Sequence, residues 1–168
     1  MKTTFKVWLI CVGAFVGNLH AQQWDSVTYQ RRIAMDRIQD VYIPRDTKDA
    51  MIELMKLTRA EGRENFMKAS EDTIASKLHF SLGRWMLIHW GMEEGSRLSH
   101  YYKSMGISNM DDQIDYLIRC FYRHVLGQDL KEAELTQFYI EKRKKLWAEE
   151  LKKRKIISET TTIRPPKK

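Results

Sequence analysis

The feature that most constrains the fold is a run of apolar residues at helical spacing between positions 71 and 90. The residues at three- and four-residue steps, which share one side of a helix, are Ile74, Leu78, Leu82, Trp85 and His89. Most of the other sides are apolar too, through Phe80, Met86, Leu87, Ile88 and Trp90. A helix that is apolar nearly all round is usually buried. We therefore expect this segment to form the centre of an all-α domain.

Turn and capping residues divide the rest of the chain into further helices. Extended backbone before Pro44 is expected to lead into a helix capped by Asp46. Later helices have suitable caps at Ser70, Ser96 and either Ser108 or Asn109. Asp129 with Glu132 resembles a capping box for a last helix from about Leu130 to Lys155. With no strand or hairpin signal, we expect five or six helices.

The first 21 residues have the order of a secretory signal peptide. Lys2 and Lys6 precede an apolar run over residues 7–16, and Ala21 suits the position before a cleavage site. The run is shorter than the roughly 20 residues that a membrane-spanning helix needs. We expect cleavage after Ala21 and export to the periplasm or the medium, with an uncleaved anchor as the alternative. Cys120 would then be the only cysteine left, and its apolar neighbours indicate a buried thiol.

Positive charge gathers at the C-terminal end of the chain. The formal charge is +7, yet residues 141–168 alone hold eleven Lys or Arg and four Glu. Since the leader contributes two lysines, residues 22–140 carry a net charge of about −2. This end could bind a protein partner or an anionic surface. Nucleic acid is not expected as a partner of an exported protein.

These observations divide the chain into four parts. We expect a signal peptide over residues 1–21, an N-terminal segment over 22–42 with a plausible helix, and a helical domain over 43–140. The last part, residues 141–168, is expected to be the basic end of a long helix followed by a disordered tail.

Several motifs in the central part resemble a known family. They are Ile43-Pro44, His79-Phe80-Ser81-Leu82-Gly83-Arg84-Trp85, Trp90-Gly91, Gly95-Ser96-Arg97-Leu98, Asp111-Asp112, Tyr122-Arg123 and Leu126-Gly127. The set resembles small bacterial proteins of the family catalogued as domain of unknown function 6794, over about residues 43–127. The resemblance implies a shared helical fold, and it implies no activity, cofactor or partner.

The chain departs from the family pattern at two pairs of positions. Arg-Asn usually stands where this chain has Leu87-Ile88, and His-Pro often stands where it has Asn109-Met110. If those polar residues line a site in the family, the site is altered here.

Eight residues are candidate contacts for a ligand or a partner: His79, Arg84, Trp85, Trp90, Arg97, Asp111, Asp112 and Arg123. Gly83, one turn after His79, leaves room for a ligand or for a closely packed helix. The paired aspartates could bind a cation, or they could simply favour the start of a helix. His79 and His89 lie about 80° apart around an ideal helix. We therefore expect no metal site, and we expect no cofactor.

Two functions of different class fit these features. The first is a non-enzymatic exported binding protein that uses the C-terminal helix or a groove between helices as its contact surface. The second is a small hydrolase or ligand-binding enzyme, which requires His79, Arg84 and Asp111 to converge on one pocket. No residue is assigned a catalytic role.

Overall fold

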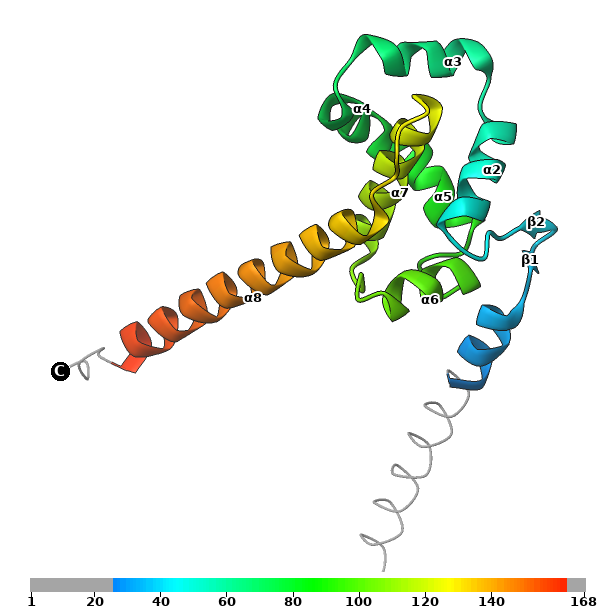
Figure 1. The fold of residues 1–168 in the computed structure, drawn as a ribbon. Coiled ribbons are helices and arrows are strands. Elements are labelled where there is room, and N and C mark those ends of the chain that lie inside the picture. The colour runs from blue at the N-terminus through cyan, green and yellow to red at the C-terminus, as the bar shows by residue number, and fades with distance from the viewer. Residues whose placement is uncertain (1–25, 163–168) are drawn as a thin grey trace, which may run out of the picture.

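The computed structural model describes residues 26–162, apart from the side chains of Met67 and of residues 155–162. The sequence-based signal peptide over residues 1–21 lies outside this range, as do residues 163–168. Among the described residues, helices account for nearly all regular structure, with one small two-stranded sheet (Figure 1). The all-α fold that the sequence predicts is confirmed.

A first helix covers residues 26–34. The elements after it are β1 (Arg37–Ile38), β2 (Val41–Tyr42), α2 (Thr47–Leu57), α3 (Ala60–Glu64), the 3-10 helix η1 (Asn65–Lys68), α4 (Glu71–Leu78), the π-helix η2 (His79–Gly83), α5 (Arg84–His89), α6 (Arg97–Ser104), α7 (Met110–Val125) and α8 (Glu132–Thr162).

The helix starts follow the capping residues that the sequence predicts. The side chains of Asp46, Ser70, Ser96 and Asn109 each accept a hydrogen bond from the backbone N–H three residues later. The predicted capping box at the last helix is wrong. Asp129 accepts from the N–H of Lys131, and α8 begins at Glu132.

The centre of the domain is α7. The apolar run predicts a different central helix, the one over residues 71–90. Packed against α7 are α2, α4, η2, α6 and α8. The run over residues 71–89 is helical, but Phe80 is 83% exposed and Ile88 is exposed as well. The π-helical turn at η2 explains the difference. Its i→i+5 bonding takes up more residues per turn, so the positions after it no longer follow the spacing of 3.6.

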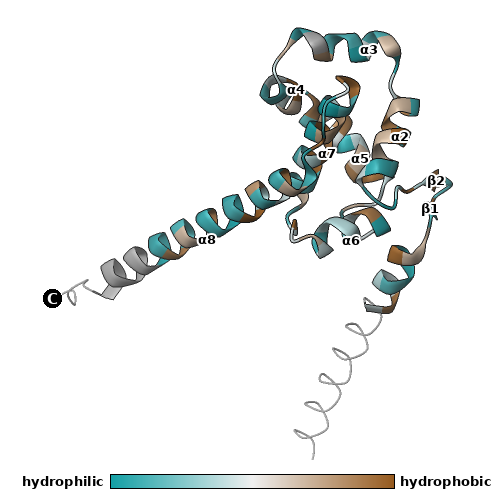
Figure 2. Cartoon of the chain, viewed as in Figure 1, coloured by the Kyte–Doolittle hydropathy of each residue, from teal (hydrophilic) through white to brown (hydrophobic). Residues whose placement is uncertain are grey.

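The long helix α8 leaves the body of the molecule part of the way along its length (Figure 1). Leu135 and Tyr139 are buried near its start, and Ile140 contacts Gly106. From Lys144 to Arg154 every residue is exposed. The projecting part is mainly hydrophilic with apolar residues interspersed (Figure 2). Over the range that the structure describes, none of the helices combines the length and apolar character needed to cross a membrane.

Candidate functional site

His79, Arg84 and Asp111 line one pocket of about 240 Å³. The first two come from η2 and the start of α5, and Asp111 comes from the first turn of α7. The other lining residues are Phe80, Gly83, Leu87, Met110 and Ile114. The second function that the sequence allows, a small hydrolase or ligand-binding enzyme, requires these three residues to share a pocket. The structure brings them together.

The close approach of two helices forms the floor of this pocket. A Cβ atom added to Gly83 would lie 2.6 Å from Cγ2 of Ile114, so no larger residue fits without a shift. Of the two roles that the sequence allows for Gly83, the packing of a neighbouring helix accounts for the contact. The pocket opens beside this contact, where η2 and α5 face the start of α7.

An exposed aromatic ring stands at the rim. The rings of Phe80 and His79 meet edge to face, with their centroids 5.2 Å apart. Their interplanar angle of 79° is one that aromatic pairs prefer. His79 therefore supports a phenyl group that the fold leaves largely in solvent.

The two charged groups of the pocket have opposite signs. Arg84 and Asp111 are both exposed. Among the ion pairs of the described residues, neither side chain has a partner. The pocket therefore offers a donor of hydrogen bonds on one element and an acceptor on another.

The two tryptophans among the candidates lie apart from this pocket lining. Trp90 is 1% exposed and belongs to the core. Trp85 meets Trp90 edge to face and stacks on His89 with a centroid separation of 4.6 Å. Both rings therefore serve the packing around α5.

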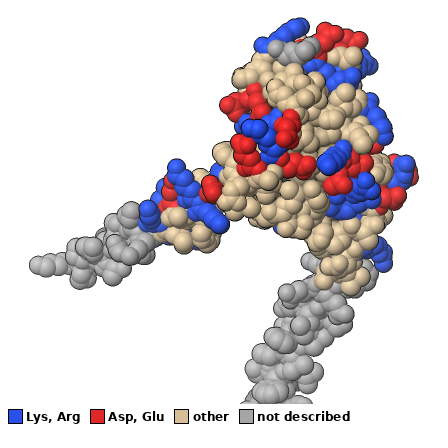
Figure 3. Space-filling view, in the orientation of Figure 1, with Lys and Arg blue, Asp and Glu red and all other residues tan. Residues whose placement is uncertain are grey.

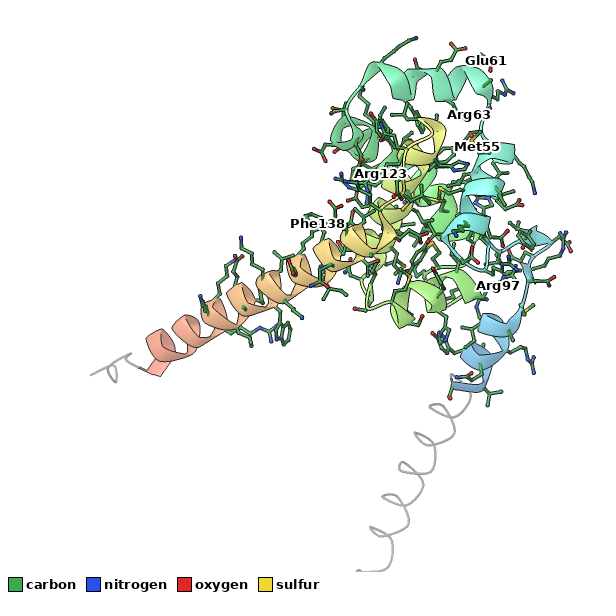
Figure 4. All side chains as sticks on the ribbon, viewed as in Figure 1. Met55, Glu61, Arg63, Arg97, Arg123 and Phe138 are labelled. Atoms are coloured by element: carbon green, nitrogen blue, oxygen red, sulfur yellow. The ribbon has the colours of Figure 1, made fainter. Side chains whose placement is uncertain are left out.

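Arg97 connects α6 to the segment that precedes α2. Its Nε donates to the carbonyl of Ile43 at 2.7 Å, and its guanidinium lies 5.0 Å from the ring centroid of Tyr42. The hydroxyl of Tyr42 in turn donates to Asp49. This side chain lies on the hairpin side of the molecule (Figure 4), where it fixes the chain as it enters the domain.

Asp112 anchors the base of α8. Its carboxylate is 1% exposed and accepts from Lys142 Nζ at 2.8 Å and from Arg143. Arg143 also donates to Asn109. Burial alone would raise the pKa of Asp112, but the hydrogen bonds from these two cations hold the pKa below its usual value. Two of the basic residues that the sequence assigns to the tail therefore bind the domain itself.

Arg123 belongs to a network of charges between α4 and α7. Its Nε donates to Glu71 at 2.8 Å, and Arg119 contacts Glu71, Asp72 and Asp115. Both arginines, Glu71 and Asp72 line a second hollow of about 260 Å³, together with Phe138. Arg123 and Phe138 are labelled in Figure 4. Red and blue side chains alternate on the face shown in Figure 3. Both arginines of this hollow are therefore already paired with carboxylates.

A second candidate surface is the projecting part of α8, called here the α8 projection and defined as residues 144–154. Its large apolar residues are Leu146, Trp147 and Leu151, all exposed. Trp147 is 60% exposed, and the guanidinium of Arg154 lies 5.9 Å from its ring centroid. The α8 projection thus carries an amphipathic surface that the described part of the chain leaves uncovered.

The apolar side of the pocket gives no clear signal in the sequence. Phe80, Met110 and Ile114 were not among the candidates, although each is adjacent in sequence or one helical turn from a candidate residue. Leu87 and Met110 also stand at the positions that depart from the family pattern. One residue of each departing pair therefore lines this pocket.

Taken together, the described residues define a small all-helical domain with a projecting C-terminal helix. Residues 43–125 match the family model described as Domain of unknown function (DUF6794), and this segment of the chain belongs to that family. The match confirms the resemblance over α2 to α7. Comparison with curated proteins gives no match, and comparison with solved structures gives none either.

Proposed function

We propose that the protein is a non-enzymatic exported binding protein that holds a protein partner on the α8 projection. One observation carries the proposal: the side of α8 that packs on the domain continues beyond it and carries exposed apolar residues there. Leu146 and Trp147 follow Tyr139 and Ile140 by seven residues, which is two helical turns. The same side of the helix is therefore buried at one end and exposed at the other.

The size and chemistry of this exposed side fit a protein contact. Trp147 and Leu151 are four residues apart and so lie on neighbouring turns of one face. Large aromatic residues beside an arginine are the usual anchors of protein interfaces. Arg154 already lies over the Trp147 ring, which is consistent with a preformed anchor.

The charge of the α8 projection favours an acidic partner. Its basic residues are Lys144, Lys145, Lys152, Lys153 and Arg154, against Glu149 and Glu150. Two copies of this helix side by side would repel each other, and a second copy of the chain is therefore the less favourable occupant. An acidic protein surface with an apolar groove complements both the charge and the apolar side.

The test is site-specific photocrosslinking in the producing cells. A photoreactive residue replaces Trp147 on the contact side, and a matched variant replaces Lys145, which is about 160° away around the helix. We expect one defined protein adduct from position 147 and none from position 145. Adducts that contain lipid, equal adducts from both positions or no adduct would contradict the proposal.

The identified partner is then tested with purified components. Trp147→Ala should weaken its affinity at least tenfold, because an anchor residue at an interface contributes on the order of 2 kcal/mol. Lys145→Ala should change the affinity by less than about threefold. Equal losses for the two variants would show that the adduct arose from charge attraction alone.

Export is the second part of the proposal and has its own test. The order of Lys6, the apolar run and Ala21 supports a cleaved leader. Amino-terminal sequencing of the protein from the periplasm or the medium should begin at Gln22. A cell-associated protein that retains Met1 would contradict export by this route.

A small hydrolase or ligand-binding enzyme is the second candidate function. The observation in its favour is that His79, Arg84 and Asp111 line one pocket. Its test is a thermal-shift and ester-hydrolysis screen of the protein beside His79→Ala. A ligand shift or turnover that this variant abolishes would support the second candidate, and no effect across the screen would remove it.

A further inference from the structure

We infer that the pocket between η2, α5 and α7 takes a free α-amino acid with an apolar side chain. The inference rests on the second candidate function, ligand binding at this pocket, and specifies the class of ligand. Three properties of the lining carry it: two unpaired charges of opposite sign, an apolar wall and a small volume.

The paired charges match a zwitterion. Arg84 presents a guanidinium that can bind a carboxylate through two parallel hydrogen bonds. Asp111 presents a carboxylate that can accept from an ammonium group. These side chains come from different helices and line the same pocket. An anion alone would bind Arg84 but meet the like charge of Asp111, and a cation alone would meet the reverse.

The apolar wall matches the side chain of such a ligand. Leu87, Met110 and Ile114 line the pocket beside the charges. Phe80 stands at the rim with 83% of its surface exposed. A branched or aromatic side chain placed against this ring would cover apolar surface that the protein leaves in water, which is favourable at about 25 cal/mol per Å².

The volume suits a ligand of about one amino acid. The space measures about 240 Å³ and is open to solvent on one side. Leucine or phenylalanine is of that size, and a longer peptide would extend into solvent. In the hollow near Arg123, by contrast, both arginines already pair with Glu71, and Arg119 also pairs with Asp72.

The experiment is an NMR titration of the protein purified from its producing cells. L-Leucine and L-phenylalanine should shift the backbone amides of residues 79–87 and 110–114 and saturate. N-acetyl-leucine lacks the ammonium charge, and leucinamide lacks the carboxylate. Each should bind at least tenfold more weakly than leucine, as should glycine, which lacks the apolar side chain.

Two substitutions test the charges separately. Arg84→Gln and Asp111→Asn should each lower the affinity for leucine at least tenfold. The controls Arg59→Gln and Asp40→Asn, at exposed positions elsewhere, should leave this affinity unchanged. If N-acetyl-leucine or leucinamide binds as tightly as leucine, the zwitterion inference is overturned while the pocket remains a ligand site. If no compound shifts these amides, and the earlier screen is also silent, both the inference and the second candidate function fail.

Discussion

At the scale of single residues, Gly83 makes the sharpest prediction about stability. Gly83→Ala should lower the free energy of unfolding by about 1–3 kcal/mol, since its Cβ would stand 2.6 Å from Ile114 on α7. Urea unfolding measures the effect.

Gly62→Ala is the matched control, because nothing lies within 4 Å of its Cβ position. It should leave stability unchanged or raise it by about 0.5–1 kcal/mol. Equal effects of the two substitutions would contradict the packing described here.

Cys120 should be nearly inert in the folded protein. It is fully buried, and burial raises the pKa of its thiol to about 12. Since the thiolate is the reactive form, alkylation at pH 8 should be about 10³-fold slower than in denaturant. Mass spectrometry of the peptide that contains Cys120 follows the reaction. Rapid labelling of the folded protein would mean that this part of α7 is open to solvent.

The sequence predicts single residues well where their role is local. The caps at Asp46 and Ser70 and the burial of Cys120 depend on a few neighbours along the chain, and all are confirmed. The contact of Gly83 with Ile114 depends on a helix much later in the chain, so the sequence leaves its partner open. For the same reason the sequence places three candidates in the pocket but misses Phe80.

At the scale of elements, two features escape the usual patterns. The π-helix η2 interrupts a run that reads as one continuous helix, because apolar residues on nearly every side hide a change in period. The hairpin turns through Gln39 and Asp40, which both have positive φ. Turns of this kind usually contain Asn-Gly or Asp-Gly, and Gln-Asp gives no such signal. Tertiary contacts rather than local preference therefore determine both features.

The contact of α8 with the domain predicts a stability that depends on pH. Asp112→Asn removes the charge that Lys142 and Arg143 share. At pH 7 the substitution should lower the free energy of unfolding by about 1–3 kcal/mol. Urea unfolding is the measurement, with Asp111→Asn as control. Asp111 is exposed on the same turn, and its substitution should cost no more than about 0.5 kcal/mol.

The sign of the pH dependence follows from the direction of the pKa change. The pKa of Asp112 is lower in the folded protein than the unfolded value of about 3.9. The stability that ionised Asp112 contributes is therefore fully present above the unfolded pKa. It is lost as the pH falls through the pKa of the folded protein. The difference in the free energy of unfolding between the wild-type protein and Asp112→Asn should shrink as the pH falls below the unfolded value of about 3.9. A difference that stays constant from pH 7 to pH 2 would show that the charge does not carry the contact.

At the scale of the whole molecule, the domain extends beyond its family match. The match ends at residue 125, yet Leu135 and Tyr139 of α8 are part of the buried core. Tyr139 also donates to Asp115 on α7. The first part of α8 is therefore needed to complete the fold of the matched segment, whereas the α8 projection adds no buried residue.

This division of α8 predicts opposite results for two truncations. A chain that ends at Lys145 loses only exposed residues of α8 among those described, so its melting temperature should fall by no more than a few degrees. A chain that ends at Lys131 loses Leu135, Tyr139 and the cations that neutralise buried Asp112. Removing a buried large side chain costs about 2–5 kcal/mol, a large part of the total stability of a small domain.

Thermal melts followed by circular dichroism should show cooperative unfolding for the first chain and none for the second. A cooperative melt of both would mean that α8 binds the domain without completing it, and loss of the melt in the first would mean that the α8 projection is part of the fold, leaving no free surface for a partner.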